Sequence, residues 1–573
     1  MISKQHLADI AFLTLLILAG FVPLAGDFFF RTIERFGTHL ARRKQLAILS
    51  IAGVAIALRV GLLWFVPIPV PGVEDEFSYL LAADTFAHGR LTNPPHAMWL
   101  YLDTFHVNQQ PTYMSKYPPA QGAVLAVGEV LGRPWIGCLL SVAGMIAAVV
   151  WALQAWLPPQ WALLGGTLVL LRLGLFGYWI NGYWGGAVAA IGGALVVGAL
   201  PRIIHFQRAS DAAILGLGES ILANSRPFEG LVLSVPVLVV LLFWLFKRAS
   251  LSRREILSRV VIPFSGVILL CGMFMGYYNW RGTGNPLLFP YTVNDRTYHN
   301  TPQLLWQQAV PQIHYANPQF EAYYNGHGRD TWNRGRVDSI GKAIHQFWFR
   351  IKTFGRFFLW PELCVPLLAF VSILRDRRVR FLVVQAAICL SGYLLVAWFF
   401  PHYAAPLLAT AFALAIQGLR HLRRWEYRGR PIGIGFSRAV VISMVFLAPL
   451  PTMEYPQLTS RARIAGELEK MPGKHLVIVH YSREHSSDRE WVYNRADIDG
   501  AKVVWARDIP GVDLVPLLNY FHSRRVWVVD ADGRSPEPVP YPGDIAAQIQ
   551  QSMHLDSGSV AAKASDGWQN EIF

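Results

Sequence analysis

Three consecutive carboxylates, Glu74, Asp75 and Glu76, follow an apolar stretch and begin a segment with helical spacing. Carboxylates this close together repel one another, and the repulsion favours a raised pKa in one of them. A carboxylate held at a membrane surface can remove a proton from a hydroxyl nucleophile. The alternative is a solvated helix N-terminus, where acidic side chains interact favourably with the helix dipole. Composition alone leaves both interpretations open.

A second group, Ser115-Lys116-Tyr117-Pro118-Pro119, lies further along the same polar segment. The two prolines end the preceding chain and favour a new helix. The apolar residues 121–131 that follow are too few to cross a bilayer, so this helix is expected at the membrane interface. The ammonium group of Lys116 would then lie at headgroup depth, where it can bind a phosphate or merely anchor the chain. A base and a phosphate-binding cation together are what displacement of a lipid phosphate from a sugar requires.

Arg226 separates two further apolar stretches, residues 211–224 and 228–246. A charge at such a place is costly unless it is paired or lies at the interface. It could help to neutralise a phosphate, or it could pair with the nearby Glu229. The sequence leaves both roles open.

The composition identifies the kind of protein that must position these residues. Of the 573 residues, 53% are hydrophobic and 15% are charged, with a mean hydropathy of +0.32. A soluble domain has about a quarter of its residues charged, so a membrane protein is expected. The net charge of +14 comes from short basic clusters between apolar stretches, which indicates membrane topology and not a nucleic-acid partner. The four cysteines have no spacing typical of a disulfide framework or a zinc site.

The hydropathy pattern predicts about twelve membrane-spanning helices, the first of them retained and not a cleaved signal peptide. Five basic clusters fall on one side of this pattern, which the positive-inside rule makes the cytoplasm. The predicted spans are residues 7–28, 46–68, 135–157, 160–178, 185–200, 211–224, 228–246, 258–278, 356–374, 379–400, 404–419 and 434–453.

The pattern divides the chain into three parts. Residues 1–45 are expected to form an N-terminal membrane helix and a basic cytoplasmic link. Residues 46–454 form a membrane region with outer loops at 69–134 and 279–350. Residues 455–573 hold short β-type runs between helical stretches, which predicts a small extracytoplasmic α/β domain. The fold class is thus a polytopic α-helical protein of the bacterial inner membrane with an α/β domain outside.

The ordered motifs across residues 45–455 resemble the GT-C superfamily of membrane glycosyltransferases, which includes protein O-mannosyltransferases and the bacterial aminoarabinose transferase acting on lipid A. Members have an acidic pair in the first outer loop, a Lys/His-x-Pro-Pro element, a short interfacial helix, a later aromatic turn and an Arg/His-Tyr pair. The corresponding elements here are Asp75-Glu76, Lys116-Tyr117-Pro118-Pro119, residues 121–131, Asn279 to Pro286, and His402-Tyr403.

This resemblance implies an inverting glycosyltransferase, mannosyltransferase-like, that moves a sugar from a polyprenyl-phosphate donor to a lipid, glycan or protein hydroxyl. Asp75 would be the general base, and Lys116 would hold the donor phosphate. Glu74 precedes the acidic pair and competes for the role of base. His402 stands where many relatives have arginine, which implies a pH-sensitive phosphate contact. The resemblance implies no nucleotide site and no firm cofactor, and leaves divalent metal dependence open.

Two other classes of function remain. One is a transporter or flippase for a lipid-linked sugar, and the other is a non-catalytic envelope scaffold. Transporters usually show internal repeats and charges in the middle of the membrane. Here the ionisable residues cluster at the ends of the spans, with Arg59 and Arg172 as exceptions. The sequence therefore favours the enzyme.

Overall fold

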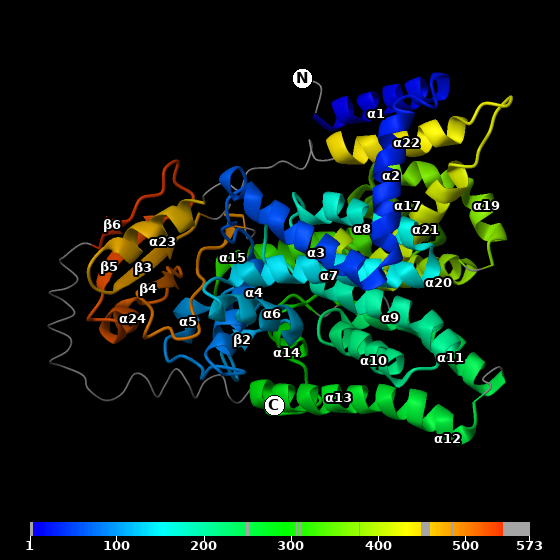
Figure 1. Cartoon of the computed structure of the whole chain (residues 1–573). Coiled ribbons are helices and arrows are strands. Elements are labelled where there is room, and N and C mark those ends of the chain that lie inside the picture. The colour runs from blue at the N-terminus through cyan, green and yellow to red at the C-terminus, as the bar shows by residue number, and fades with distance from the viewer. Residues whose placement is uncertain are drawn as a thin grey trace.

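The computed structural model is a bundle of apolar helices with a small α/β unit at one end (Figure 1). It describes residues 4–247, 251–304, 307–308, 311–377, 379–447, 459–482, 485–486 and 489–541. The expected boundary between residues 454 and 455, the end of the last predicted span, and residues 542–573 lie outside these ranges.

Six helices among the described residues are long and apolar enough to cross a membrane, and three shorter helices are also apolar. The six are Lys44–Trp64, Pro134–Trp156, Gly186–Phe206, Pro227–Lys247, Arg253–Thr283 and Pro401–Leu422. They contain α3 (Lys44–Gly61), α7 (Pro134–Trp156), α9 (Gly186–Phe206), α11 (Pro227–Lys247), α12 (Arg253–Ile256), α13 (Ile262–Thr283) and α21 (Leu408–Leu422). The shorter ones correspond to most of α1 (Lys4–Phe21), to α20 (Arg380–Gly392) with the turn after it, and to α22 (Ile432–Phe446).

The expected total of about twelve spans is not established, because several predicted spans are short or broken helices. The predicted span 160–178 is α8 (Pro159–Val169) followed by one π-helical turn, and 211–224 is the short helix α10 (Ala209–Ala223). The predicted span 356–374 is interrupted at Trp360, which has a positive φ of 52° and precedes a proline. These interruptions depend on local backbone geometry, which hydropathy does not report.

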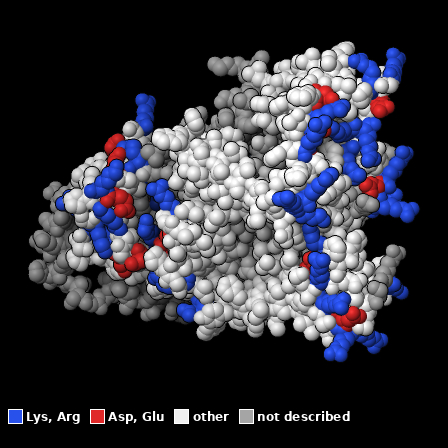
Figure 2. All heavy atoms as spheres, in the orientation of Figure 1, with Lys and Arg blue, Asp and Glu red and all other residues white. Residues whose placement is uncertain are grey.

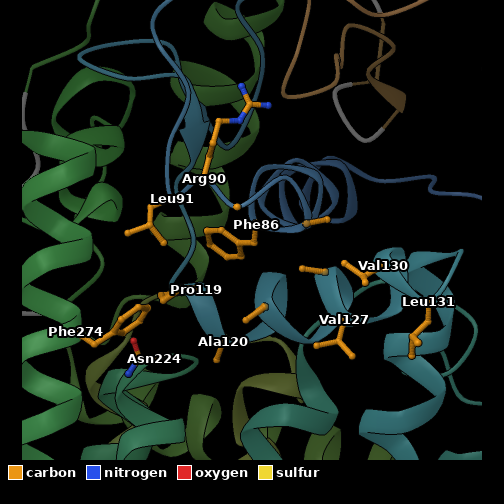
Figure 3. Close-up of a pocket in the computed structure, with 14 residues that line it drawn as sticks. Phe86, Arg90, Leu91, Pro119, Ala120, Val127, Val130, Leu131, Asn224 and Phe274 are labelled. Carbon is orange, nitrogen blue, oxygen red and sulfur yellow. The ribbon is translucent and has the colours of Figure 1, made fainter.

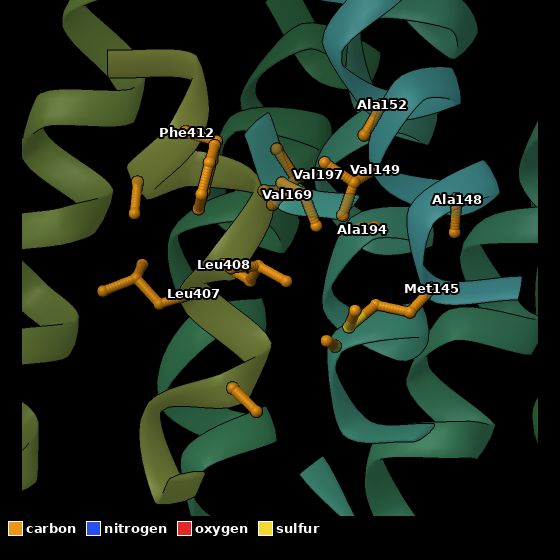
Figure 4. Packing of buried hydrophobic residues seen from close by; sticks show 14 of the residues in the cluster. Met145, Ala148, Val149, Ala152, Val169, Ala194, Val197, Leu407, Leu408 and Phe412 are labelled. Atoms are coloured by element: carbon orange, nitrogen blue, oxygen red, sulfur yellow. The ribbon is translucent and has the colours of Figure 1, made fainter. Parts of the chain in front are cut away.

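The core of the bundle lies where α7, α9 and α21 meet. Met145 and Val149 from α7, Ala194 from α9 and Phe412 from α21 pack together there (Figure 4). Small residues allow the close approach. A Cβ atom on Gly193 would lie 2.0 Å from the carbonyl oxygen of Pro406, so only glycine fits this helix contact.

Residues 31–44, expected to be a basic link, are mostly helical and complete α2 (Asp27–Arg42), which crosses the bundle (Figure 1). Its acidic side chains contact basic ones just after α21 and on α22. Asp27 binds Arg438 at 2.8 Å, and Glu34 binds Arg423 at 2.7 Å. Figure 2 shows Lys and Arg gathered at the end of the molecule opposite the α/β unit, with an uncharged band between the two ends.

The α/β unit contains a four-stranded sheet in the order β4-β3-β5-β6. Strands β3 (His475–His480), β4 (Val503–Arg507) and β5 (Arg525–Asp530) are parallel, and β6 (Val539–Pro540) pairs antiparallel with β5. The first three coincide with the β-type runs in the sequence. Helices α23 (Ser460–Lys470) and α24 (Val515–Tyr520) accompany the sheet.

Short elements between the bundle and the α/β unit carry the candidate site. Helix α4 (Glu74–Ala87) begins at the acidic triplet, and α6 (Pro119–Val130) begins at the second proline, so the short helix predicted after the proline pair is present. Its position at the membrane interface stays a prediction. A small hairpin of β1 (Val107–Asn108) and β2 (Met114–Ser115) precedes α6. The remaining short helices are α5 (Trp99–Leu102), α14 (Pro290–Tyr298), α15 (Pro318–Phe320), α16 (Arg329–Gly335), α17 (Ile340–Phe354), α18 (Trp360–Cys364) and α19 (Phe370–Arg375).

Candidate functional site

Asp75 lies in the first turn of α4 and is held by two side chains from the hairpin region. Its Oδ1 atom is 2.7 Å from Nδ1 of His106 and accepts a hydrogen bond from the hydroxyl of Tyr117. Burial raises the pKa of Asp75, but the charge that His106 carries when protonated, its hydrogen bond and the Tyr117 hydroxyl lower it further, to well below its ordinary value. Asp75 is therefore ionised at neutral pH. Its Oδ2 atom accepts no hydrogen bond from the described residues.

Glu76 has a different environment from its neighbour. Its Oε2 atom accepts hydrogen bonds from the backbone amides of Gly72 at 2.8 Å and Val73 at 3.3 Å. Its Oε1 atom accepts one from the backbone amide of Tyr183 at 2.8 Å. Both oxygens are thus occupied in capping α4 and in fixing a turn of the bundle against it. These hydrogen bonds give Glu76 a structural role, and its catalytic role stays a prediction.

Lys116 is a buried cation without a counter-ion in contact. Only 4% of the residue is exposed, and its ammonium group lies 5.3 Å from the ring centre of Tyr117 and 5.5 Å from that of Tyr291. No residue in the described ranges forms a hydrogen bond or ion pair with this ammonium group. Burial lowers the pKa of Lys116, although the carboxylates of Asp295, Asp75 and Glu74 counteract the effect. An anion placed beside it would restore the lost solvation.

Arg226 and the His402-Tyr403 pair complete the cluster. The guanidinium carbon of Arg226 lies 4.1 Å from the ring centre of Tyr403. Burial lowers the pKa of Arg226, but the phenols of Tyr79 and Tyr403 and the carboxylate of Glu229 raise it above its usual value. No contact ion pair joins Arg226 to Glu229 within the described part of the chain.

His402 packs edge-on against Trp184, with ring centres 4.8 Å apart, and lies within electrostatic range of Asp75 and Arg226. Glu74 is close enough to act electrostatically on Lys116. The residues proposed from separate outer segments therefore lie in one cluster: Asp75, Lys116, Tyr117, Arg226, His402 and Tyr403.

Two residues of this cluster were not foreseen. His106 precedes β1 and contacts Asp75, but a lone histidine in an irregular segment has no spacing that marks it. Asp295 on α14 faces Lys116, and burial raises its pKa to about 7 while Lys116 counteracts the shift. Only the approach of α14 to the hairpin reveals its position. No group of three or more His, Cys, Asp or Glu suited to a metal ion occurs in the described ranges.

An apolar groove leads to this cluster. It has a volume of about 610 Å³ and is lined along α6 by Val127, Val130 and Leu131, with Phe86 from α4 and Phe274 from α13 (Figure 3). A smaller cavity of about 20 Å³ is lined by Lys116 and Tyr291, among others. Pro119 and Asn224 line both cavities, so the groove continues towards the ammonium group.

Solved structures that resemble this chain include an archaeal oligosaccharyltransferase and a bacterial protein named ArnT. An oligosaccharyltransferase from Archaeoglobus fulgidus, tethered with an acceptor peptide, has a TM-score of 0.45 and 10% identity. The alignment covers 76% of this chain and 61% of that one, so this chain spans about three fifths of its length.

ArnT from Cupriavidus metallidurans, bound to undecaprenyl phosphate, has a TM-score of 0.47 and 14% identity over 84% of this chain and 92% of that one. No protein-family model and no curated protein sequence matches this chain. The likeness at these scores concerns the course of the backbone, and function has to follow from the residues of the cluster.

Proposed function

We propose that this chain is an inverting glycosyltransferase that moves a sugar from a polyprenyl-phosphate donor to a lipid, glycan or protein hydroxyl. The observation that carries the proposal is the buried ammonium group of Lys116, which has no counter-ion in contact among the described residues. It lies at the end of an apolar groove and within electrostatic range of Asp75. We place the reaction on the extracytoplasmic side of a bacterial inner membrane, because the basic clusters lie at the opposite end of the bundle (Figure 2).

The groove suits the lipid part of such a donor. Its volume of about 610 Å³ is in the range of ligand sites, and its lining is almost entirely apolar. Val127 and Val130, on the outer surface of α6, are 53% and 71% exposed, so a polyprenyl chain can enter sideways from the bilayer. A lipid lying in the groove would present its phosphate to Lys116.

The cluster supplies the groups that a displacement needs. In the proposed reaction the acceptor hydroxyl attacks the anomeric carbon from the side opposite the phosphate, and the bond from that carbon to the phosphate oxygen breaks. The hydroxyl proton passes to Asp75, and polyprenyl phosphate leaves with its negative charge balanced by Lys116 and Arg226. Attack from the opposite side inverts the anomeric centre. His402 and Tyr403 border the phosphate end of this cluster, and Tyr117 orients Asp75.

Arg59 and Arg172, the two ionisable residues that do not lie at the ends of predicted spans, contact other parts of the fold. Arg59 donates hydrogen bonds to the carbonyl of Val66 at 3.0 Å and to Asn181 at 2.8 Å. Arg172 donates to the carbonyl of Arg356 at 3.3 Å and lies 4.3 Å from the ring centre of Trp360. Both arginines thus have partners within the fold, and their position away from the helix ends does not require a transport pathway.

The test uses the purified chain in lipid nanodiscs with a panel of undecaprenyl-phosphate-linked hexoses and pentoses. The envelope glycans and glycoproteins missing from cells without this chain identify the acceptor by mass spectrometry. We expect Asp75→Asn to abolish release of undecaprenyl phosphate, by at least about 100-fold, because the proton acceptor is lost. The matched control is Asp338→Asn, which alters an exposed ion pair with Lys342 and should leave the rate unchanged. Full activity in Asp75→Asn contradicts the assigned base.

A further inference from the structure

His106 is a buried histidine that contacts both halves of the proposed site. Its Nδ1 atom lies 2.7 Å from Oδ1 of Asp75, and its side chain is 7% exposed. Its backbone carbonyl accepts hydrogen bonds from the hydroxyl of Ser78 at 2.6 Å and from the backbone amide of Lys116 at 3.2 Å. One residue thus joins α4, which carries Asp75, to the segment that carries the phosphate-binding lysine.

The backbone of His106 is also unusual. Its φ of 61° lies in the left-handed region, which only a few per cent of residues other than glycine adopt, although histidine does so more often than most. Such conformations persist where surrounding contacts fix them, and they cluster at functional sites. The two hydrogen bonds to its carbonyl fix this one, and they aim the imidazole at Asp75.

We propose that His106 is a positioning residue for the proposed glycosyl transfer: its Nδ1–H group holds Oδ1 of Asp75, so that Oδ2 faces the acceptor hydroxyl. This inference rests on the proposed function. The Asp75 carboxylate can only accept hydrogen bonds, so Nδ1 must carry the proton. The Tyr117 hydroxyl donates to the same Oδ1 atom, which leaves Oδ2 as the oxygen that can receive the acceptor proton.

The charges around His106 determine how the pair responds to pH. The groups that face it are Asp75 on α4, Lys116 and Tyr117 beside the hairpin, His299 after α14, and Tyr323. Burial and the charge of Lys116 lower the pKa of His106 below its ordinary value, although Asp75 opposes them. His106 is therefore neutral at pH 7. Below its pKa it becomes an imidazolium, which holds the Asp75 carboxylate more strongly and makes it a weaker base.

Two substitutions separate the hydrogen bond from the backbone. His106→Gly suits the positive φ and removes the donor. His106→Asn also suits the positive φ, and its amide nitrogen can take the place of Nδ1. We expect kcat for His106→Gly to fall about 100-fold with little change in KM, and His106→Asn to recover most of that loss. The acid limb of the wild-type rate profile should be absent in His106→Asn, because an amide does not titrate. His345→Asn, on an exposed histidine of α17, should match the wild type.

Different results would contradict the role of His106 and the proposed glycosyl transfer. A wild-type chain that transfers no sugar from any donor of the panel contradicts the proposed function itself. An active wild type with an equally active His106→Gly variant contradicts the role of His106. A His106→Asn variant as impaired as His106→Gly, or one that keeps the acid limb, also overturns it. Binding of undecaprenyl phosphate by His106→Gly, measured in parallel, shows that the pocket is folded.

Discussion

Two buried cations in this molecule differ in what surrounds them. Arg507, at the end of β4 in the α/β unit, donates a hydrogen bond to Glu490 at 2.6 Å and lies near Gln319 at 3.4 Å. Glu490 in turn accepts hydrogen bonds from the Tyr481 hydroxyl and from the backbone amide of Val492. Lys116 is equally buried but has only ring faces and distant carboxylates around it.

We interpret this difference as separating a structural charge, Arg507, from one that is available to bind a ligand, Lys116. A buried charge is costly in either place. In the α/β unit the cost is offset within the fold, because Arg507 and Glu490 neutralise each other. Around Lys116 the desolvation cost of the buried charge is not offset unless an anion binds beside the ammonium group. A buried charge without a counter-ion in contact, beside an open groove, is typical of a binding site.

Substitution of Lys116 should produce the largest effect and should affect activity alone. We expect Lys116→Met to reduce sugar transfer about 10²–10³-fold, since a preorganised cation no longer stabilises the leaving phosphate. Thermal stability should be unchanged or higher, because a buried unpaired charge is removed. Lys342→Met, at an exposed lysine, is the control for both measurements. Loss of stability in Lys116→Met with transfer intact would mean that the lysine is structural.

Substitution of Arg507 should reduce stability and leave the activity of the folded protein unchanged. We expect Arg507→Met to destabilise the protein by about 3–5 kcal/mol, because Glu490 is left buried without its partner. The double variant Arg507→Met/Glu490→Gln should be less destabilised, and the transfer rate per folded molecule should be retained in both. Denaturant titration followed by tryptophan fluorescence measures the first effect. A stable Arg507→Met variant without activity would contradict the structural role of Arg507.

A smaller effect is expected from Asp103, where the α/β unit meets the outer segments. Tyr298 donates a hydrogen bond to it at 2.8 Å, and burial raises its pKa from 3.8 to about 7, against the opposing effects of Tyr298 and Arg507. The folded state therefore binds the proton more tightly than the unfolded state. This contribution to stability is complete below pH 3.8 and is lost as the pH rises towards 7, by at most about 1.4 kcal/mol per pH unit. Asp103→Asn should flatten this part of the profile of melting temperature against pH. An unchanged profile would contradict the assignment.

Local sequence patterns predicted the parts of the site that depend on interactions between residues close together in the sequence. Hydropathy and the proline pair located the start of α6, and the acidic triplet marked the start of α4. Charge at the ends of apolar stretches identified Lys116 and Arg226, because unpaired charges are costly there. The β-type runs located three strands of the sheet.

The features of the site that the sequence did not predict depend mainly on contacts between segments far apart in the sequence. Glu76 could not be separated from Asp75, because its partner amide belongs to Tyr183, more than a hundred residues away. His106 could not be identified, because only the hairpin brings it to Asp75. The breaks within predicted spans, such as the one at Trp360, follow from backbone geometry. Long-range pairing leaves no periodic signal in a single sequence.

The central claim is that Lys116 binds the phosphate of a polyprenyl carrier, and binding of undecaprenyl phosphate tests it most directly. The measurement is native mass spectrometry of the chain released from phosphatidylcholine nanodiscs, with the lipid titrated in. We predict that the wild type and Lys342→Met retain undecaprenyl phosphate, while Lys116→Met binds it at least about tenfold more weakly, a loss of about 1.4 kcal/mol. Equal binding by Lys116→Met and the wild type would contradict the account.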